Sequence, residues 1–431
     1  MWLKREIRRR LGRLLTRQRR LVLAKEPPHL ESRFADLDSL GLYLHVPVCR
    51  QICPYCPYSR QLFAPDLAQR YAGAVIREID LYADLVGGRP VTSFYIGGGT
   101  PTTMLHHGLD RMLEHIFARF NMRCDIHMES HPNDLTPENL RIISSLGVRH
   151  LSIGVEALQD RHLKALHRPY TVAQVKEAVG RAVGVGFDCV NVDAIFALPD
   201  QTLSEVDELG RSFVKLGVDQ VAAYPLFEFP YTRWKEIARH NGYKAFGALA
   251  KRRMLAVLES IFYDAGFRRT SVWAFTRHGV PKYCSVTVPL YLGLGAAGGT
   301  YLKDIFYLNS FDVPAYVAAL DRGRLPIALS LQLSEQMQMA GWLYWRLYET
   351  RFRKNDFCRR FGRDFDEVYG RYIRALALLG LVRQNEDEVV CTDGGAYWLH
   401  WIEDLFSIDY VSRLWGICSR DPWPEGVALE V

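Results

Sequence analysis

Long apolar runs are missing from this sequence of 431 residues. No stretch reaches the roughly 18 apolar residues that a transmembrane helix needs, so no membrane span is predicted. The N-terminus is basic, but it lacks the apolar core and the small-residue cleavage site of a signal peptide. Hydrophobic residues still make up 48% of the chain, which is enough for a large core. We therefore expect a cytoplasmic protein of two or three domains.

A general basic surface is also missing, although the formal net charge is +6. Residues 1–20 hold nine Lys or Arg and one acid, Glu6, so this segment carries +8 and the remainder carries 6 − 8 = −2. The body of the protein is thus nearly neutral. We expect no nucleic-acid partner, because nucleic-acid-binding domains carry a basic patch or stripe.

The basic segment itself predicts an amphipathic helix over residues 2–22, within an N-terminal unit of residues 1–28. Its apolar residues fall on one stripe at helical spacing and its arginines cover the rest. The stripe consists of Leu3, Ile7, Leu11, Leu14 and Leu15. Such a helix fits an anionic membrane surface, here the inner face. The alternatives are a solvated arm or a helix packed on its own domain.

The nine cysteines do not form the pattern of a disulfide framework in a chain of this length. Three of them, Cys49, Cys53 and Cys56, lie within eight residues, and the next is as distant as Cys124. A structural zinc site or an ordinary ferredoxin cluster requires four protein ligands. Three thiolates without a fourth favour a four-iron cluster with one open iron. The alternative is three buried or disulfide-bonded cysteines.

Apolar strands alternate with helical stretches from residue 41 to residue 240, which predicts an α/β fold with a parallel sheet. Functional residues of such sheets lie at the carboxyl ends of the strands. The predicted strands are 42–46, 91–96, 125–129, 151–155, 189–195 and 220–225, and the predicted helices include 67–85, 109–120 and 136–146.

The alternation stops near residue 240, where a helix is predicted over residues 243–265. We assign residues 241–330 to an extension of the sheet on the substrate side. Residues 331–431 form a mainly helical C-terminal domain, in which an apolar turn, an acidic hairpin and a Thr-x-x-Gly segment resemble a winged helix. Packing against the main domain is favoured over DNA binding, because this region has no basic recognition stripe.

A glycine triplet, Gly97-Gly98-Gly99, follows the second predicted strand and precedes Thr100. Glycines at a strand end let the backbone approach a ligand closely. The exposed N–H and C=O groups can hold a carboxylate or an ammonium group.

The cysteine loop resembles that of the radical S-adenosylmethionine (SAM) superfamily, which has Cys-x3-Cys-x2-Cys with an aromatic residue, here Tyr55, before the last cysteine. The motifs LYLHVP, YIGGGTPT, HMESHPNDLT, SIGVEALQD, HRPYT, DAIFALPDQT and AAYPLFEFP resemble one branch of it. That branch contains oxygen-independent coproporphyrinogen III oxidases, heme chaperones and class C radical SAM methyltransferases and cyclopropanases. It implies a partial (β/α)6 barrel.

The resemblance also implies roles for individual residues. The three cysteines would hold a [4Fe-4S] cluster, and the glycine motif would hold the SAM amino group. Glu129 would bind the ribose hydroxyls, Arg168 would face the SAM carboxylate and Asp193 would hold the adenosyl part. Tyr43 would contact SAM bound to the cluster or a second SAM.

Three positions depart from the pattern of the branch. Glu156 replaces the usual Gln, which adds a charge beside SAM and makes Glu156, with Tyr43, a candidate catalytic residue. Tyr58 stands where coproporphyrinogen oxidases have a further cysteine. Cys284 and Ser285 stand where heme chaperones have His-Asn.

These departures favour carbon methylation or cyclopropanation of a hydrophobic substrate, using two SAM molecules. The alternatives are a coproporphyrinogen- or heme-modifying enzyme and a heme-binding chaperone. A flavodoxin or ferredoxin is expected as electron donor, and a lipid or another hydrophobic small molecule as substrate.

Overall fold

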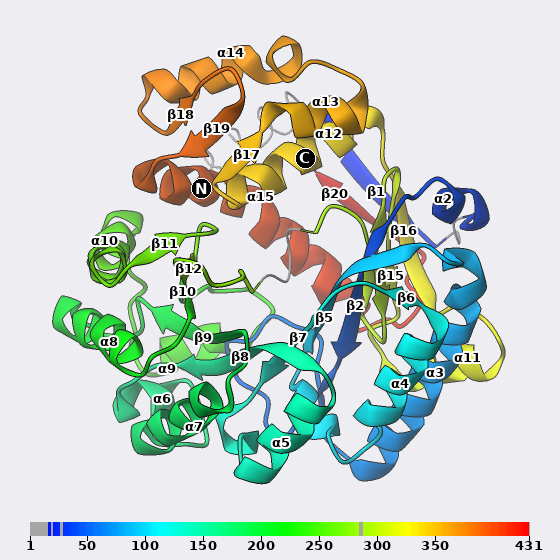
Figure 1. Cartoon of the computed structure of the whole chain (residues 1–431), viewed down its shortest axis with the longest axis horizontal. Coiled ribbons are helices and arrows are strands. Elements are labelled where there is room, and N and C mark those ends of the chain that lie inside the picture. The colour runs from blue at the N-terminus through cyan, green and yellow to red at the C-terminus, as the bar shows by residue number, and fades with distance from the viewer. Residues whose placement is uncertain (1–15, 19, 26–28, 284–287, 431) are drawn as a thin grey trace.

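The computed structural model describes residues 16–430 except 19, 26–28 and 284–287. Its centre is a run of parallel strands that curves around an interior, with helices on the outside (Figure 1). The order across this run is β10-β9-β8-β7-β5-β2, and every neighbouring pair is parallel. The strands are β2 (Leu40–Val46), β5 (Pro90–Gly98), β7 (Ile126–Ser130), β8 (Val148–Glu156), β9 (Cys189–Phe196) and β10 (Gln220–Pro225).

Helices connect these strands and cover the outer face of the sheet. Two of them begin with full capping boxes, in which Thr171 pairs with Gln174 and Thr202 pairs with Glu205. The six-stranded parallel arrangement confirms the α/β partial barrel expected from the sequence. The helices are α3 (Pro65–Val86), α4 (Leu109–Arg119), α5 (Pro137–Ser145), α6 (Asp160–Ala165), α7 (Val172–Val185), α8 (Leu203–Lys215), α9 (Trp234–His240) and α10 (Ala248–Asp264).

The sheet continues past both edges of the parallel run. Beyond β10, β12 (Ala274–Arg277) and β11 (Phe267–Arg269) add antiparallel strands. Beyond β2, β13 pairs in parallel, and five antiparallel strands follow in the order β14-β15-β16-β1-β20. These strands are β13 (Tyr291–Leu294), β14 (Gly299–Leu302), β15 (Ile305–Asn309), β16 (Ile327–Gln332), β1 (Arg20–Ala24) and β20 (Gly426–Glu430).

Short elements complete the core. The strand pair that frames the cysteine loop is β3 (Val48–Cys49) and β4 (Gln61–Leu62), which are parallel. The other elements are α2 (Glu31–Ala35), β6 (Asn121–Met122), α11 (Val313–Asp321) and the 3-10 helices η1 (Pro101–Met104) and η2 (Pro132–Asp134).

Two sequence predictions are wrong in part. The helix predicted over residues 2–22 cannot include Arg20–Val22, which belong to β1; most of that helix lies outside the described residues. The alternation of RLVLA suits a strand whose Leu23 is fully buried between β16 and β20. The helix predicted over 243–265 starts only at Ala248, because residues 243–247 form a loop after α9.

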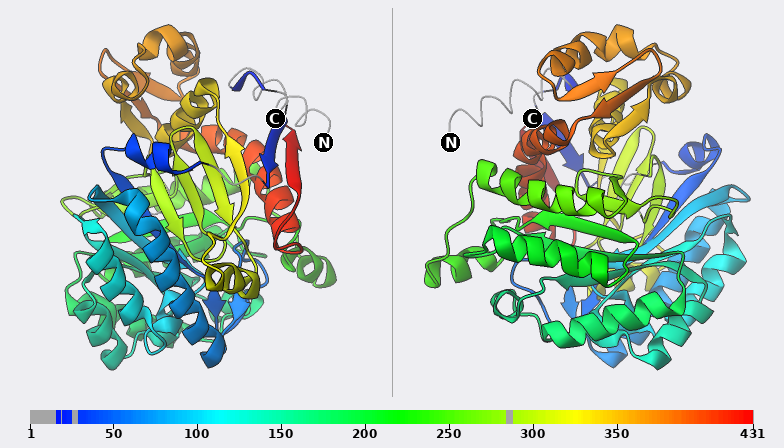
Figure 2. Two further views of the ribbon diagram at one scale, coloured as in Figure 1. Left: turned by 90° about the vertical axis from the view of Figure 1, so that its right-hand side faces the viewer. Right: turned by 60° about the vertical axis from the view of Figure 1, so that its left-hand side comes forward.

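The C-terminal region contains a small sheet, β17-β19-β18, flanked by helices in the manner of a winged helix. Its last helix, α15, leaves this unit and runs back across the barrel (Figures 1 and 2). No helix in the described part of the chain is both long and apolar enough to span a bilayer. The elements are α12 (Glu335–Tyr348), β17 (Arg351–Arg353), α13 (Lys354–Phe361), α14 (Phe365–Leu378), β18 (Val382–Gln384), β19 (Glu388–Cys391) and α15 (Asp393–Cys418).

Candidate active site

A cavity of about 700 Å³ opens at the carboxyl ends of the parallel strands. It is bounded by the cysteine loop, the strand ends and α15. Most of the residues predicted for the site line it, from elements far apart in the sequence. They are Cys49, Cys53, Tyr55, Cys56, Gly98, Gly99, Thr100, Glu129, Glu156, Arg168 and Asp193.

The cysteine loop is held at both ends by backbone hydrogen bonds. Gln61 N donates to Pro47 O at 2.7 Å, and Phe63 N donates to Cys49 O at 2.9 Å. The three thiols therefore converge on the cavity, and all three are free. Burial raises the pKa of the Cys49 thiol and that of Cys56, the latter to about 12.

Gly97 and Gly98 end β5, and Gly99 follows the strand, packed against the cysteine loop. Gly98 has φ +113°, and a Cβ there would lie 2.5 Å from the His45 ring. A Cβ on Gly99 would lie 2.8 Å from the carbonyl oxygens of Val46 and Val48. Both positions thus need glycine, one for its backbone conformation and both for lack of space.

Glu129 lies at the end of β7 and is held by the neighbouring strand. Its carboxylate accepts the Tyr95 hydroxyl at 2.6 Å and the Gly98 N–H at 3.0 Å. Burial raises the pKa of Glu129, and these hydrogen bonds oppose that rise. The result is a fixed carboxylate at the floor of the cavity.

Asp193 on β9 is the end of a chain of buried polar side chains inside the barrel. It accepts hydrogen bonds from Ser152 at 3.2 Å and from Asn191 at 3.1 Å. Asn191 in turn accepts from Gln220 at 3.1 Å, and Gln220 also bonds both backbone groups of Tyr283. Burial raises the pKa of Asp193 to about 8.

Glu156 and Arg168 form a buried ion pair, with Nη2 and Oε1 2.7 Å apart. Arg168 also donates to the Gly154 carbonyl at 2.8 Å and to Cys53 Sγ at 3.2 Å. Arg168, the predicted partner of the SAM carboxylate, thus connects the cysteine loop with the end of β8. Glu156 has φ +69°, a left-handed conformation that is uncommon for a side chain of this size.

The two tyrosines predicted for the site differ in position. Tyr55 lines the cavity beside the Arg168 and Glu156 pair. Tyr43 lies deeper in the barrel, where its hydroxyl is 2.8 Å from His45 Nδ1 and its ring contacts that of Tyr95. Burial lowers the pKa of His45 to about 4, so this imidazole is neutral at pH 7.

These residues fit a cluster with three protein ligands. Three convergent thiols bounded by a close-packed glycine strand suit iron, and thiolate is the form that binds metal. The Arg168 guanidinium and the Thr100 hydroxyl, at 3.2 and 3.4 Å from sulfur atoms of the triad, would compensate the negative charge of bound thiolates.

The part of the cavity wall that α12 and α15 supply was not predicted from the sequence, because it comes from the C-terminal region. His400 of α15 lies edge-on between the rings of Trp273 and Tyr348. Both of its ring nitrogens face carboxyl oxygens. Nδ1 lies 3.1 Å from an oxygen of Glu403, and Nε2 lies 3.3 Å from an oxygen of Asp404. His400, Asp404 and both aromatic rings line the cavity.

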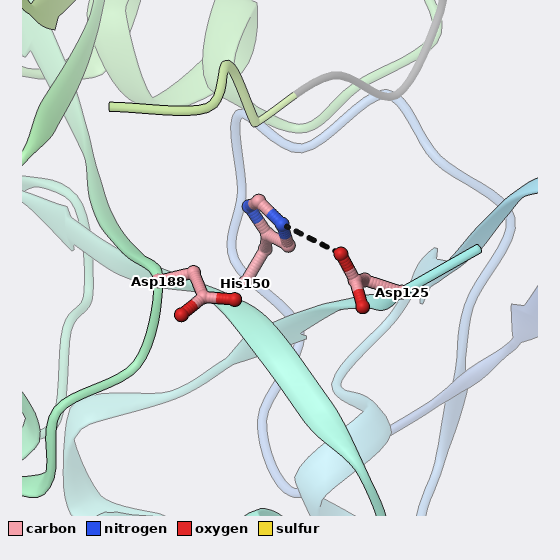
Figure 3. A group of neighbouring side chains, drawn as sticks. All are labelled: Asp125, His150 and Asp188. Carbon is pink, nitrogen blue, oxygen red and sulfur yellow. Dashed lines mark ion pairs between the residues drawn. The ribbon is translucent and has the colours of Figure 1, made fainter. Parts of the chain in front are cut away.

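A second polar group lies at the opposite, amino ends of the strands (Figure 3). His150 Nε2 is 3.9 Å from Asp125 Oδ2, and Asp188 lies on its other side. The ring of His150 stacks on that of His127, with centroids 3.9 Å apart. Asp188 is already paired with Arg149 through two hydrogen bonds. We therefore interpret Asp125, His150 and Asp188 as a structural polar cluster.

Comparisons with known proteins agree with this geometry. The model of the radical SAM superfamily matches residues 43–213. The heme chaperone HemW of Bacillus subtilis is 24% identical over 360 residues, covering 82% of this chain and 95% of that protein. The oxygen-independent coproporphyrinogen III oxidase of Bradyrhizobium diazoefficiens is 24% identical over 394 residues, covering 85% and 86%.

A solved structure shows the same fold. Coproporphyrinogen III oxidase (HemN) from Escherichia coli superposes with a TM-score of 0.76 at 19% identity, covering 89% of this chain and 94% of that one. The named relatives are thus heme chaperones and coproporphyrinogen oxidases. They favour the alternative interpretation of the sequence over methylation or cyclopropanation.

Proposed function

We propose that this chain is a radical SAM enzyme acting on a tetrapyrrole. It carries a radical SAM domain and is homologous to the HemW chaperones and to oxygen-independent coproporphyrinogen III oxidases. The observation that carries this proposal is the meeting of three free thiols, a glycine strand end and three acids around one cavity. A cavity of about 700 Å³ has room for a ligand of cofactor size.

Cys49, Cys53 and Cys56 would hold the cluster, and Thr100 and Arg168 would stabilise its sulfur ligands. When bound, a four-iron cluster with one open iron supplies the electron that cleaves SAM and yields a 5′-deoxyadenosyl radical.

The chain's own residues orient the SAM molecule. Glu129, with its carboxylate fixed by Tyr95 and Gly98, would accept the ribose hydroxyls. Asp193 would face the adenosyl part, and the Glu156–Arg168 pair would offer the guanidinium to the SAM carboxylate. Burial of these groups excludes water, which strengthens each of these interactions.

The proposal is tested by anaerobic reconstitution. The wild-type chain should take up about four irons, and the triple Cys49, Cys53 and Cys56→Ala variant almost none. Reduced enzyme should then convert SAM to 5′-deoxyadenosine. A full cluster in the triple variant, or no SAM cleavage with any tetrapyrrole, would contradict the proposal.

Product analysis with SAM labelled at its methyl group separates the tetrapyrrole reaction from alkylation. Label transferred to a substrate carbon would restore methylation or cyclopropanation. Equilibrium dialysis against SAM before reduction counts the bound molecules and tests whether a second one is held.

A further inference from the structure

One wall of the cavity is apolar. It combines aromatic rings from the loop after β10 and from the turn before β12 with aliphatic side chains from α15. Its members are Phe227, Phe229, Trp273, Ile408 and Val411, all of which line the cavity. Such a wall suits a planar, hydrophobic ligand.

The charges around this cavity do not suit a polyanion. Within the described part of the chain, the basic side chains that line it are Arg50, Arg60, Arg168 and Lys282, and the acidic ones are Glu129, Asp134, Glu156, Asp193 and Asp404. These cations therefore do not exceed the acids in number.

The cations are also engaged within the protein. Lys282 pairs with Glu349 at 2.8 Å, and Arg50 with Asp134 at 3.4 Å. Arg60 donates to the carbonyls of Tyr58 and Cys53, and Arg168 pairs with Glu156. Binding several substrate carboxylates here would require breaking these contacts.

Asp404 stands out on the apolar wall as a positioned acceptor. His400 is buried between two aromatic rings, and its Nε2 holds the Asp404 carboxylate at 3.3 Å. On the other side of the ring, Glu403 is buried and its pKa lies well above the usual value. In the tautomer that carries its proton on Nε2, His400 donates to Asp404 while Nδ1 faces Glu403.

We propose that Asp404, positioned by His400, is a specificity-determining residue that accepts an N–H or cationic group of a planar substrate and disfavours polycarboxylates. This rests on the proposed function and narrows it, since it directs the site toward tetrapyrroles with few free carboxylates. The donor group of the substrate would face Asp404, and its apolar part would lie against the aromatic wall.

The test uses the full-length chain with its reconstituted cluster, saturated with SAM and without reductant. SAM then fills its own subsite, so that the probes report on the remaining space. The probes are proflavine, a planar cation with amino donors, and 8-anilinonaphthalene-1-sulfonate, an anion of similar size. Fluorescence titration of wild type should show tighter binding of proflavine.

Asp404→Asn should weaken proflavine binding about tenfold or more, the loss expected for a charge-assisted hydrogen bond. The matched control is Asp84→Asn, which removes the same charge from a side chain that is 92% exposed on α3. A second variant, Ile408→Lys, adds a cation to the wall and should tighten binding of the sulfonate. Preference of wild type for the sulfonate, or equal effects of Asp404→Asn and Asp84→Asn, would overturn the proposal.

A parallel titration separates this inference from the proposed function. Coproporphyrin III, with four carboxylates, is compared with its tetramethyl ester. Tighter binding of the ester supports both ideas, and tighter binding of the tetra-acid refutes the role of Asp404. If neither porphyrin binds while proflavine binding still depends on Asp404, the tetrapyrrole assignment fails and the role of Asp404 stands.

Discussion

At the scale of single residues, Glu156 adds a charge at a position where the branch of the superfamily that this sequence resembles usually has glutamine. Glu156→Gln keeps the side-chain size and an acceptor for Arg168, but it leaves the buried guanidinium without its counter-charge. We expect the apoprotein to lose about 1 to 3 kcal/mol of stability, less than the full loss of a buried pair partner. Thermal unfolding with and without the cluster measures this.

The same substitution bears on the pH dependence of SAM cleavage. Burial raises the pKa of Glu156, so its ionisation lies above the usual range for a glutamate, and Arg168 opposes that rise. Wild type should therefore show a rate change as Glu156 ionises with rising pH, and Glu156→Gln should lack that limb. Identical pH–rate profiles would show that the charge plays no part.

Gly98 allows a sharper test of the glycine strand end. Gly98→Ala would place a Cβ 2.5 Å from the His45 ring at a positive φ, so we expect a loss of stability of roughly 2 to 4 kcal/mol and weak SAM binding. Gly88→Ala is the matched control, because nothing lies within 4 Å of its Cβ position. Similar thermal midpoints for the two variants would contradict the packing argument.

At the scale of elements, one buried carboxyl joins a helix to the sheet extension. Glu78 of α3 accepts hydrogen bonds from Gly295 N at 2.7 Å, Asn309 Nδ2 at 2.6 Å and the Tyr316 hydroxyl at 2.6 Å. Burial raises its pKa from 4.5 to about 7. The folded state thus binds this proton more tightly than the unfolded state does.

The sign of the linkage follows from that difference. A raised pKa in the folded state gives stability that is fully present below the unfolded pKa and is lost as the pH rises through about 7. We expect the thermal midpoint of wild type, relative to that of Glu78→Gln, to fall between about pH 4.5 and pH 7 and to level off above that. A constant difference over this range would show that Glu78 does not titrate there.

Elements of the parallel run could be predicted because their strands are short apolar runs followed by amphipathic helices. The cysteine loop and the strand-end acids could be placed for the same reason, since parallel strands bring their carboxyl ends to one edge. The wall made by His400 and Asp404 could not, because α15 reaches the cavity only through long-range packing. The local sequence pattern of α15 does not show that this helix reaches the cavity.

The N-terminal strand shows a second limit of local reasoning. Residues 20–22 continue the helical stripe of the preceding segment, yet β1 forms because partners at residues 426–430 and at Ser330 complete its hydrogen bonds. Tertiary pairing thus overrides a local helical pattern. The boundaries proposed at residues 41, 240 and 330 remain predictions.

At the scale of the whole molecule, a deletion that tests membrane contact of the N-terminus has to spare β1, which is part of the sheet. Residues 1–15 lie outside the described part of the chain, and their membrane contact remains a proposal. We expect the full-length chain to co-sediment with anionic vesicles and to be released by salt. Deletion of residues 2–15, which spares β1, should abolish this binding without lowering thermal stability. Equal sedimentation of both forms would refute it.

The pairing of β1 with β20 joins Arg20 to Glu430 and Ala24 to Gly426, so β20 is the outer strand at this edge of the sheet and covers β1. During synthesis, β1 leaves the ribosome some 400 residues before its partner. At roughly 5 to 20 residues per second, it waits about 20 to 80 seconds. Its other partner, β16, follows β1 by roughly 300 residues. Once β16 has paired with β1, the other edge of β1 stays open until β20 emerges, and an open edge is a template for pairing with other chains. Closure of the sheet at this edge therefore has to wait for β20, and until then the backbone groups along one side of β1 have no strand partner.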